Sequence, residues 1–179
     1  MDIKGKSVLV TGGCGFIGSH LVDRLVEKEC NVTVLDDLSS STTEYLEPHR
    51  REGKVNVVVG DVCDYNMVKK CVEDVDVVFH FAAQADVRRS VLDPRTDFNV
   101  NVHGTVNVLE AMRNSGAEKI IFASSGGTLY GVAKRMPTPE DTPPAPISPY
   151  GASKASSEMY LSAYHACYGI SAISLRYAN

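Results

Sequence analysis

Three glycines at intervals of three residues limit what this chain can fold into more than any other feature. Gly12, Gly15 and Gly18 lie between the apolar run Ser7–Thr11 and the helix-like segment Phe16–Lys28. Glycine at each point lets the backbone turn tightly, approach a pyrophosphate and pack the helix against the strand. The helix N-terminus then presents free N–H groups to an anion. The order predicts a dinucleotide-binding unit, with a tight turn that binds no ligand as the alternative.

Short runs rich in valine and isoleucine alternate with helix-length segments along the chain. The expected strands are Ser7–Thr11, Asn31–Leu35, Val55–Val59, Asp76–Phe81, Lys119–Ala123 and Ser171–Leu175. The expected helices are Phe16–Lys28, a short one near Thr43–Arg51, Tyr65–Val72, Arg95–Asn114 and Pro149–Tyr168. Several strands are continuously apolar, which is typical of strands buried on both faces. We predict one α/β domain over residues 1–179, a doubly wound parallel sheet (Rossmann fold) with helices on both faces.

Composition argues against several other classes of protein. The 179 residues carry a formal net charge of -4 and no basic tract, so we expect no nucleic-acid partner. Apolar runs are strand-sized and no cationic leader precedes one, so we expect neither a membrane-spanning helix nor a secretory signal. Five scattered cysteines without a C-x-x-C pair indicate reduced thiols in the cytoplasm and no metal site.

Carboxylates follow the second and third expected strands. Asp36 stands where a carboxylate accepts hydrogen bonds from the adenosine ribose and repels a 2′-phosphate; no arginine stands beside it, which favours NAD over NADP. Asp37 either shares this role or caps the next turn. Asp61 follows the third strand, where it can meet the adenine amino group or act as the N-cap of the helix Tyr65–Val72.

The segment after the fourth expected strand is built from small residues. Ala82 and Ala83 allow the backbone to lie close to a dinucleotide. His80, at the end of that strand, is interpreted as a core histidine rather than a catalytic one.

Tyr150 and Lys154 form a Y-x-x-x-K pair at the head of the helix Pro149–Tyr168. Residues four apart share a helix face, so both side chains reach one point. A free tyrosine has a pKa of about 10, but a neighbouring ammonium and an oxidised nicotinamide both favour its phenolate. Downstream of a nucleotide motif, the pair predicts an acid/base centre in which Lys154 also hydrogen-bonds the nicotinamide ribose.

Residues with hydroxyl groups follow the end of the fifth expected strand, at the sheet edge where ligands bind. We take Ser125 as the candidate that hydrogen-bonds the reacting oxygen beside Tyr150, with Ser124 and Thr128 as alternatives. A Gly-rich turn with helix-capping serines is the other interpretation. The proline-rich segment 137–149 is expected to be a loop, either a wall of the site or an ordinary surface connection.

Together these motifs resemble the NAD-dependent epimerase/dehydratase family of extended short-chain dehydrogenases/reductases, and within it the nucleotide-sugar 4-epimerases. The resemblance implies bound NAD, a nucleotide-sugar substrate and further roles for Asn99, Tyr177 and Asn179. The implied catalytic residues are Ser125, Tyr150 and Lys154. The cofactor-binding residues are Gly12, Gly15, Phe16, Ile17, Gly18, Asp36, Asp37, Asp61, Val62, Phe81, Ala82, Ala83, Asn99, Ser124, Tyr150, Lys154 and Tyr177.

The implied reaction is epimerisation at C4 of the sugar with Tyr150 as base, through transient oxidation by NAD. A 4,6-dehydratase starts identically but needs an acid/base pair where this chain has Gly126 and Gly127, and a UDP-glucuronate decarboxylase is a further alternative. A non-catalytic NAD-binding fragment or sensor is the alternative from another class, and intact Tyr150 and Lys154 argue against it.

The chain departs from the family pattern in two respects. Gly126 stands where the family usually has its catalytic serine or threonine. Family members also continue through a further strand and a substrate domain, so we expect that domain to be absent here and the last strand, Ser171–Leu175, to be a bare apolar edge. The resemblance implies a homodimer of the full-length protein through Pro149–Tyr168 and Arg95–Asn114; core packing is the alternative for the tyrosine stripe on Pro149–Tyr168.

Overall fold

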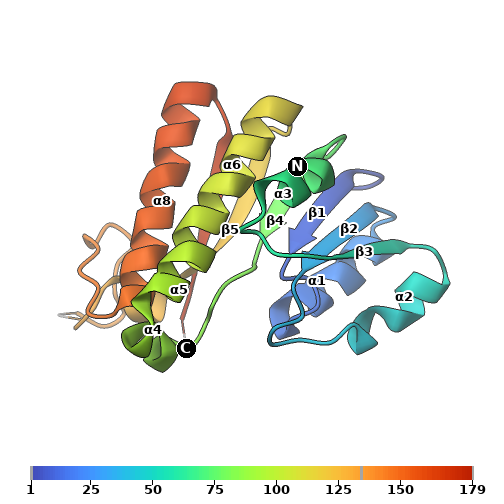
Figure 1. Cartoon of the computed structure of the whole chain (residues 1–179). Coiled ribbons are helices and arrows are strands. Elements are labelled where there is room, and N and C mark those ends of the chain that lie inside the picture. Colours follow the sequence, from blue (N-terminus) through green and yellow to red (C-terminus); the bar gives the residue numbers. More distant parts are fainter. Residues whose placement is uncertain (1, 134, 179) are drawn as a thin grey trace.

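Six parallel strands form one sheet in the computed structural model, which describes residues 2–133 and 135–178. The strand order is β3-β2-β1-β4-β5-β6 (Figure 1). The strands are β1 (Ser7–Thr11), β2 (Asn31–Asp36), β3 (Val55–Val59), β4 (Val77–His80), β5 (Lys119–Ser125) and β6 (Ser171–Tyr177). The order reverses between β1 and β4, which makes the carboxyl ends of these two strands the expected ligand crevice. The predicted doubly wound sheet is confirmed.

Helices cover the sheet and connect its strands. They are α1 (Phe16–Glu27), the short turn η1 (Glu44–Leu46), α2 (Glu47–Arg51), α3 (Tyr65–Val72), α4 (Val87–Leu92), α5 (Pro94–Phe98), η2 (Asn99–His103), α6 (Gly104–Ser115), α7 (Gly126–Leu129) and α8 (Pro149–Tyr168). In the part of the chain that the structure describes, no helix is both long and apolar enough to cross a membrane.

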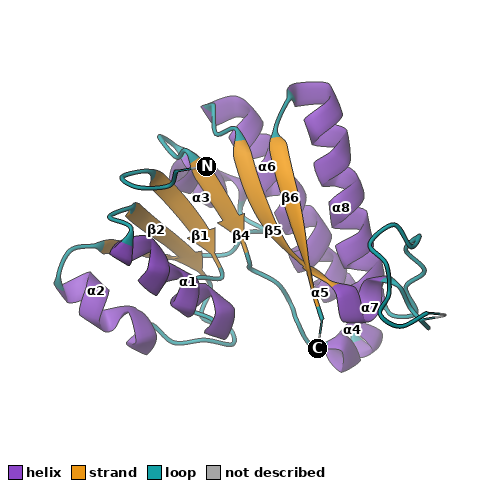
Figure 2. Ribbon diagram, turned by 180° about the vertical axis from the view of Figure 1, so that it is seen from behind, coloured by secondary structure: helices purple, strands orange, loops and turns teal. Residues whose placement is uncertain are grey.

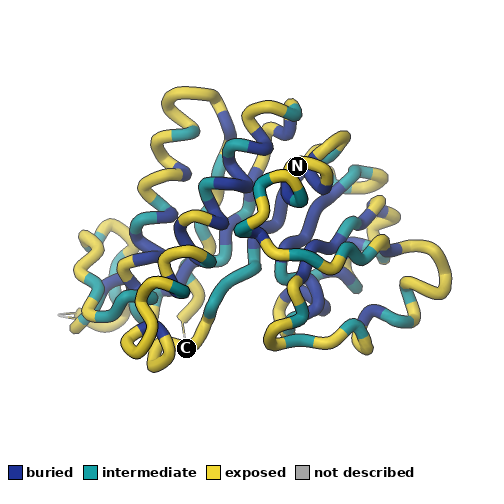
Figure 3. Tube along the Cα trace, viewed as in Figure 1, coloured by how far each residue is buried: buried dark blue, intermediate teal, exposed yellow. Residues whose placement is uncertain are grey.

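The two faces of the sheet bury two separate cores. Alternate residues of one strand point to opposite faces, so Leu9 packs with α3, α6 and α8 while Val8 and Val10 pack with α1. Figure 3 shows the buried strands at the centre of the molecule, and Figures 1 and 2 show the helices on either side. Burial on both faces explains why these strands read as continuous apolar runs.

The half of the sheet that contains β5 and β6 is covered by helices on a single face. β6 alternates between exposed and half-buried residues, and Ile173, Leu175 and Tyr177 are 57%, 36% and 36% exposed. Figure 2 looks onto this face, and among the described residues no helix lies over β5 and β6 there. The exposed apolar strand at the edge of the sheet agrees with the sequence-based expectation.

The long helix expected over Arg95–Asn114 is composite. It runs as α5, η2 and α6, and η2 is a π-helical turn. The backbone carbonyl of Asn101, inside that turn, accepts hydrogen bonds from the hydroxyls of Thr105 and Ser157. Side-chain donors therefore stabilise a turn that hydrophobic periodicity does not reveal.

Two short helices and several element bounds also differ from the sequence prediction. α4 begins at the N-cap Asp86, whose carboxylate accepts from the Arg88 and Arg89 amides, and α7 follows Ser125 directly. Strand β4 is shorter than predicted, whereas β2, β5 and β6 are longer. Elements of four to six residues carry too few side chains for a periodic signal.

Candidate active site

The glycine turn after β1 is closed by backbone contacts that exclude side chains. Gly12 has φ +69°, and a Cβ there would lie 2.6 Å from the Ala82 nitrogen. A Cβ on Gly18 would overlap the Gly12 carbonyl oxygen, whereas one on Gly15 would meet its nearest atom at 3.4 Å. Two of the three glycines are thus required by close approach of backbone to backbone.

The N-terminus of α1 has the form that the phosphate prediction requires. Gly15 is its N-cap and offers no side-chain acceptor to the amides of the first turn. Phe16 and Ile17, predicted to touch the cofactor, are 78% and 47% exposed beside these amides. A twelve-residue helix therefore presents free N–H groups and its positive dipole end at the switch point of the sheet.

Asp36 ends β2 with a buried carboxylate that is already hydrogen-bonded. It accepts from the Cys14 amide at 2.9 Å, the Leu38 amide at 3.0 Å and the Ser41 hydroxyl at 2.8 Å. The carboxylate thus connects the glycine turn to the end of β2. The neighbouring Asp37 is exposed and accepts from the amide and hydroxyl of Ser39, so it caps the next turn.

The helix-cap interpretation of Asp61 is wrong. Asp64 is the N-cap of α3 and accepts from the Asn66 and Met67 amides, while Asp61 accepts from the Cys63 amide and is exposed. Val62 is buried against α6, where a Cβ on Gly104 would meet it at 2.7 Å. The backbone carbonyl of exposed Asn99 accepts from the thiol of Cys63, the residue that follows Val62.

The end of β4 is pinned to the end of β1. The Thr11 hydroxyl accepts from the Phe81 and Ala82 amides at 3.2 Å each, and Ala83 follows half-buried. The backbone of Ala82 thus lies next to the glycine turn, while close approach of a dinucleotide to Ala82 and Ala83 stays a prediction.

His80 is a core residue, as interpreted from the sequence. Its ring is 1% exposed and lies between the hydroxyls of Thr11 and Thr105, at 2.7 and 3.0 Å. Burial and the nearby charge of Lys154 lower the pKa of His80 to about 3, so the ring is neutral at physiological pH.

Tyr150 is positioned at the first turn of α8 by contacts from two other elements. The Ser148 hydroxyl caps the helix through the Gly151 amide, and the buried hydroxyl of Ser90 in α4 accepts from the Tyr150 amide at 3.2 Å. A Cβ on Gly151 would lie 2.6 Å from the Thr128 carbonyl oxygen, so α8 approaches α7 closely here.

Lys154 lies one turn further along α8 and is 2% exposed. Its Nζ donates to the Ala123 carbonyl at 2.9 Å and lies 5.6 Å from the centre of the Tyr150 ring. The structure therefore brings the predicted Tyr–Lys pair together at the carboxyl end of β5. Their catalytic roles remain predictions.

Burial has the largest effect on the protonation of both Tyr150 and Lys154. Burial lowers the pKa of Lys154 to about 8, partly opposed by the negative charge of Asp97. Burial and then Asp97 raise the pKa of Tyr150. The phenol form of Tyr150 is therefore favoured, and Lys154 by itself does not provide the phenolate that was expected in part from its charge.

The three candidate hydroxyls occupy different environments. Ser124 donates to Glu158 at 2.6 Å and faces α8. Ser125 stands at the N-cap position of α7 without a side-chain capping bond, and its oxygen accepts from the Thr128 hydroxyl at 2.9 Å. The helix-capping alternative therefore gains no support, and Ser125 keeps its own proton to donate.

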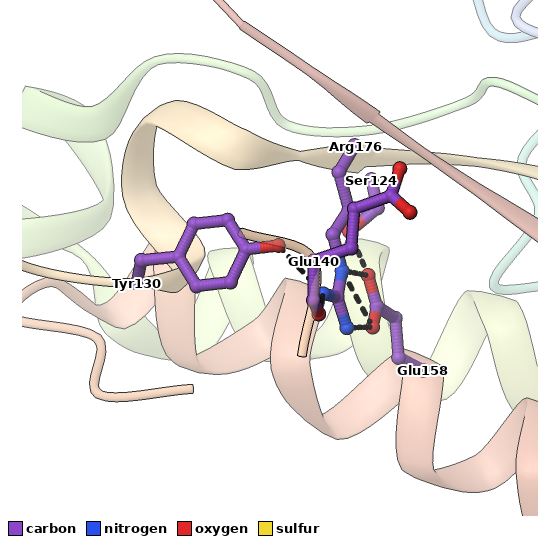
Figure 4. Close-up of polar contacts among 5 residues, drawn as sticks. All are labelled: Ser124, Tyr130, Glu140, Glu158 and Arg176. Atoms are coloured by element: carbon purple, nitrogen blue, oxygen red, sulfur yellow. Dashed lines mark hydrogen bonds and ion pairs between the residues drawn. The ribbon is translucent and has the colours of Figure 1, made fainter. Parts of the chain in front are cut away.

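Ser124 belongs to a polar cluster around Arg176 (Figure 4). The guanidinium of Arg176 pairs with Glu158 at 2.7 Å and donates to the Tyr130 hydroxyl and the Glu140 backbone carbonyl. These contacts join β6, α8 and the proline-rich loop. The loop therefore packs against the site end of the sheet, which favours the wall over the ordinary surface connection.

Several polar residues of the site gave no signal in the sequence reading. Arg176 and Glu158 are separated by 18 positions, and Asp97 and Ser153 by 56. Tyr177, which was predicted, lies opposite Ser125 in the β5–β6 register, and Asn179 lies outside the described residues. Within residues 2–133 and 135–178, no group of three His, Cys, Asp or Glu side chains is arranged to hold a metal ion.

A dinucleotide-type glycine turn and a Tyr-x-x-x-Lys pair at one edge of a doubly wound sheet define a Rossmann domain of the short-chain dehydrogenase/reductase class. The chain belongs to the GDP-mannose 4,6 dehydratase family, whose model matches residues 9–179. The resemblance to epimerases and dehydratases drawn from the motifs is thereby confirmed.

Known proteins similar to this chain include epimerases. The UDP-glucose 4-epimerase of Mycolicibacterium smegmatis is 44% identical over 172 residues, which cover 96% of this chain and 55% of that protein. The Thermotoga maritima UDP-glucose 4-epimerase, solved with UDP-glucose, is 43% identical with a TM-score of 0.91 over 97% of this chain and 55% of its own. The Thermus thermophilus UDP-glucose 4-epimerase, solved with NAD, is 45% identical with a TM-score of 0.89 over 96% and 54%. The chain thus spans about half the length of the relatives it matches.

Proposed function

We propose that this chain is the NAD-binding portion of a nucleotide-sugar 4-epimerase that works by transient oxidation at C4. The observation that carries the proposal is the meeting of Tyr150 and Lys154 at the sheet edge that also bears the glycine turn. The similar epimerases from Mycolicibacterium smegmatis and Thermotoga maritima support this function and a UDP-glucose-like substrate.

The residues present fit a dinucleotide. The space where a Cβ on Gly12 or Gly18 would lie is taken up by backbone, so the turn stays bare, and the uncapped first turn of α1 suits a pyrophosphate. Asp36 would accept from the adenosine ribose with the remaining lone pair of Oδ2 and disfavour a 2′-phosphate, which favours NAD over NADP. Asp61, Val62 and the segment 81–83 would line the remainder of the cofactor.

In the proposed reaction, NAD supplies the hydride acceptor and then the hydride donor. Tyr150 must first lose its own proton to solvent; as the phenolate it then takes the proton of the sugar 4-hydroxyl and later returns it. Ser125, whose oxygen is held by Thr128, donates its own proton to the same sugar oxygen and orients it. The buried ammonium of Lys154 stabilises the phenolate when it forms, since an opposite charge in a dry site favours the ionised phenol.

A 4,6-dehydratase is the second candidate, because the family model that matches carries that description. Such an enzyme needs acid and base groups just after the serine position, and this chain has Gly126 and Gly127 in the first turn of α7. A Cβ at Gly126 would meet the Arg176 carbonyl at 3.1 Å, so the position is also sterically tight. These glycines favour the epimerase.

A homodimer through α6 and α8 forms part of the proposal. Tyr160 and Tyr168 on α8 are 45% and 50% exposed, whereas the Tyr164 hydroxyl donates to Glu110 of α6. The tyrosine stripe therefore divides between packing against α6 and an exposed face suited to helix–helix association. We propose the cytoplasm as the location, because the cysteines are free thiols.

The proposed function is tested by an activity assay on a protein that joins this chain to a second half like that of its relatives. With UDP-glucose we expect UDP-galactose as product, and Tyr150→Phe should lower turnover by at least about 100-fold, the typical contribution of a general base. NAD should stay bound in the variant, measured by mass spectrometry after denaturation. A 4-keto-6-deoxy product would establish the dehydratase instead, and unchanged turnover would move the base to another residue.

A further inference from the structure

Asp97 is a buried carboxylate to which the proposed reaction assigns no role. It lies in α5 and is 0% exposed. Removing a carboxylate from water costs free energy unless the group is hydrogen-bonded and balanced by an opposite charge. None of the ion pairs among residues 2–133 and 135–178 includes Asp97.

Neutral donors from three segments converge on this carboxylate. The Ser153 hydroxyl of α8 donates to Oδ2 at 2.5 Å. The side-chain amides of Asn101 in η2 and Gln84 after β4 donate to Oδ1 at 2.9 and 3.3 Å. Asp97 therefore joins the segment that follows the small residues 82 and 83 to the helix that carries the Tyr–Lys pair.

Asn101 extends this connection to the backbone. Its side chain accepts from the Gln84 amide at 2.9 Å and donates to the Gln84 carbonyl at 3.0 Å, in the manner of a neighbouring strand. Asp97, by bonding Asn101, fixes the orientation of that side-chain amide. The π-helical turn η2 and the end of β4 are thus held in one arrangement.

Lys154 is a buried cation that, like Asp97, has no ion-pair partner among the described residues. Its ammonium donates to the Ala123 carbonyl and otherwise lies over the rings of Phe122 and Tyr150, at 4.8 and 5.6 Å from their centres. The residue that precedes it, Ser153, is the one that bonds Asp97. Two fully or nearly fully buried charged residues are therefore linked through Ser153, which donates to Asp97 and precedes Lys154 in α8.

We propose that Asp97 is the buried counter-charge of Lys154 and a positioning residue for the Tyr150–Lys154 pair. The attraction acts through space, since the two groups form no ion pair within the described ranges. It keeps Lys154 charged in a dry site, and the bond to Ser153 fixes the first turn of α8 against α5. The proposal rests on the proposed role of the pair, but its test needs no turnover.

Other titratable groups around Lys154 do not provide this charge. His80 of β4 is neutral, and Tyr150 on the same helix is a phenol in this state. Glu158, one turn along α8, is paired with Arg176. Asp97 is the carboxylate whose charge raises the pKa of Lys154 against the effect of burial.

The test measures the Lys154 titration in residues 1–179 by NMR of isotope-labelled lysine, with Lys154→Met identifying its resonance. Asp97→Asn should lower the pKa of Lys154 by about one unit, as expected for loss of a nearby opposite charge. Ser153→Ala is the matched control, because it removes the strongest bond of Asp97 and keeps the charge. Asp97→Glu should restore much of the shift.

An unchanged Lys154 pKa in folded Asp97→Asn, or an equal shift in Ser153→Ala, would overturn the proposal. A melting experiment covers the case in which Asp97→Asn folds poorly. Adding Lys154→Met to Asp97→Asn should raise the melting temperature, because the uncompensated cation is removed. A double variant that melts lower than Asp97→Asn, or does not fold at all, contradicts the pairing of charges.

Discussion

At the scale of single residues, the site depends on charges that are buried with few partners. Lys154 enters the interior beside Tyr150, and Asp36 and Asp97 are buried carboxylates satisfied by hydrogen bonds from uncharged groups. Each is costly to bury and would be replaced by an apolar residue if stability alone were at stake. A buried lysine with a shifted pKa at the end of β5 supports the proposal that the site lies there.

The first prediction concerns the pH dependence that Lys154 gives to stability. Its pKa falls from 10.5 to about 8 on folding, so the native state loses the proton first as pH rises. The cost of the buried cation is therefore full below pH 8 and is relieved between pH 8 and 10.5. The free energy of unfolding of Lys154→Met minus that of wild type should therefore be larger at pH 7 than at pH 10. The expected change is on the order of 3 kcal/mol, since one pKa unit is about 1.4 kcal/mol.

Urea unfolding of both chains at several pH values between 7 and 10 measures this difference. The exposed Lys69→Met in α3 serves as control and should show no such trend. A stability difference that stays constant with pH would mean that Lys154 keeps its proton in the folded protein throughout this range.

At the scale of elements, the glycine turn couples strand to helix through backbone contacts. Gly12 approaches the end of β4 and Gly18 approaches Gly12, so β1, α1 and β4 meet without side chains between them. The composite helix α5–η2–α6 is coupled to α8 by hydrogen bonds instead. Its π-helical turn turns the Asn101 carbonyl toward two hydroxyls instead of leaving it in a regular helical ladder.

The second prediction compares two glycines of the same turn. Gly18→Ala should destabilise the chain by about 2–3 kcal/mol, because the new methyl group overlaps the rigid Gly12 carbonyl. Gly15→Ala should cost less than about 1 kcal/mol, because its methyl group meets nothing closer than 3.4 Å and its φ is -74°. Denaturant unfolding compares them, and equal losses would show that the turn adjusts to a methyl group at either position.

At the scale of the whole molecule, helices cover both faces of one half of the sheet but only a single face of the half that contains β5 and β6. The glycine turn, Asp36 and the Tyr–Lys pair all lie within the described domain, whereas β6 exposes Ile173 and Leu175. The relatives are about twice as long as this chain. Contacts that recognise the sugar are therefore expected to come largely from the part of the relatives that the chain does not match.

The third prediction separates the binding of NAD from the turnover of the nucleotide sugar. Residues 1–179 by themselves should bind NAD, and more tightly than NADP, but should not interconvert UDP-glucose and UDP-galactose. Remote contacts to the sugar are needed to orient its C4 against the nicotinamide. Calorimetric titration of both dinucleotides and a coupled epimerase assay test this. Robust turnover by the 179-residue chain would contradict the expectation that contacts to the sugar come from outside it. NADP binding at equal affinity would contradict the proposed role of Asp36.

The sequence by itself determined the sheet, the glycine turn and the Tyr150–Lys154 pair. These are encoded locally: apolar runs fix strands, glycines fix a turn, and a spacing of four places two side chains on one helix face. Tertiary structure decided which polar groups are used. The cap of α3 is a local contact, in which Asp64 rather than Asp61 accepts from the Asn66 and Met67 amides. Ser124, by contrast, is hydrogen-bonded to Glu158, 34 positions away, and only the packing of α8 on β5 brings the two together. Likewise Asp97 meets Ser153 only when α5 packs on α8, and no local pattern specifies a contact between residues 56 positions apart.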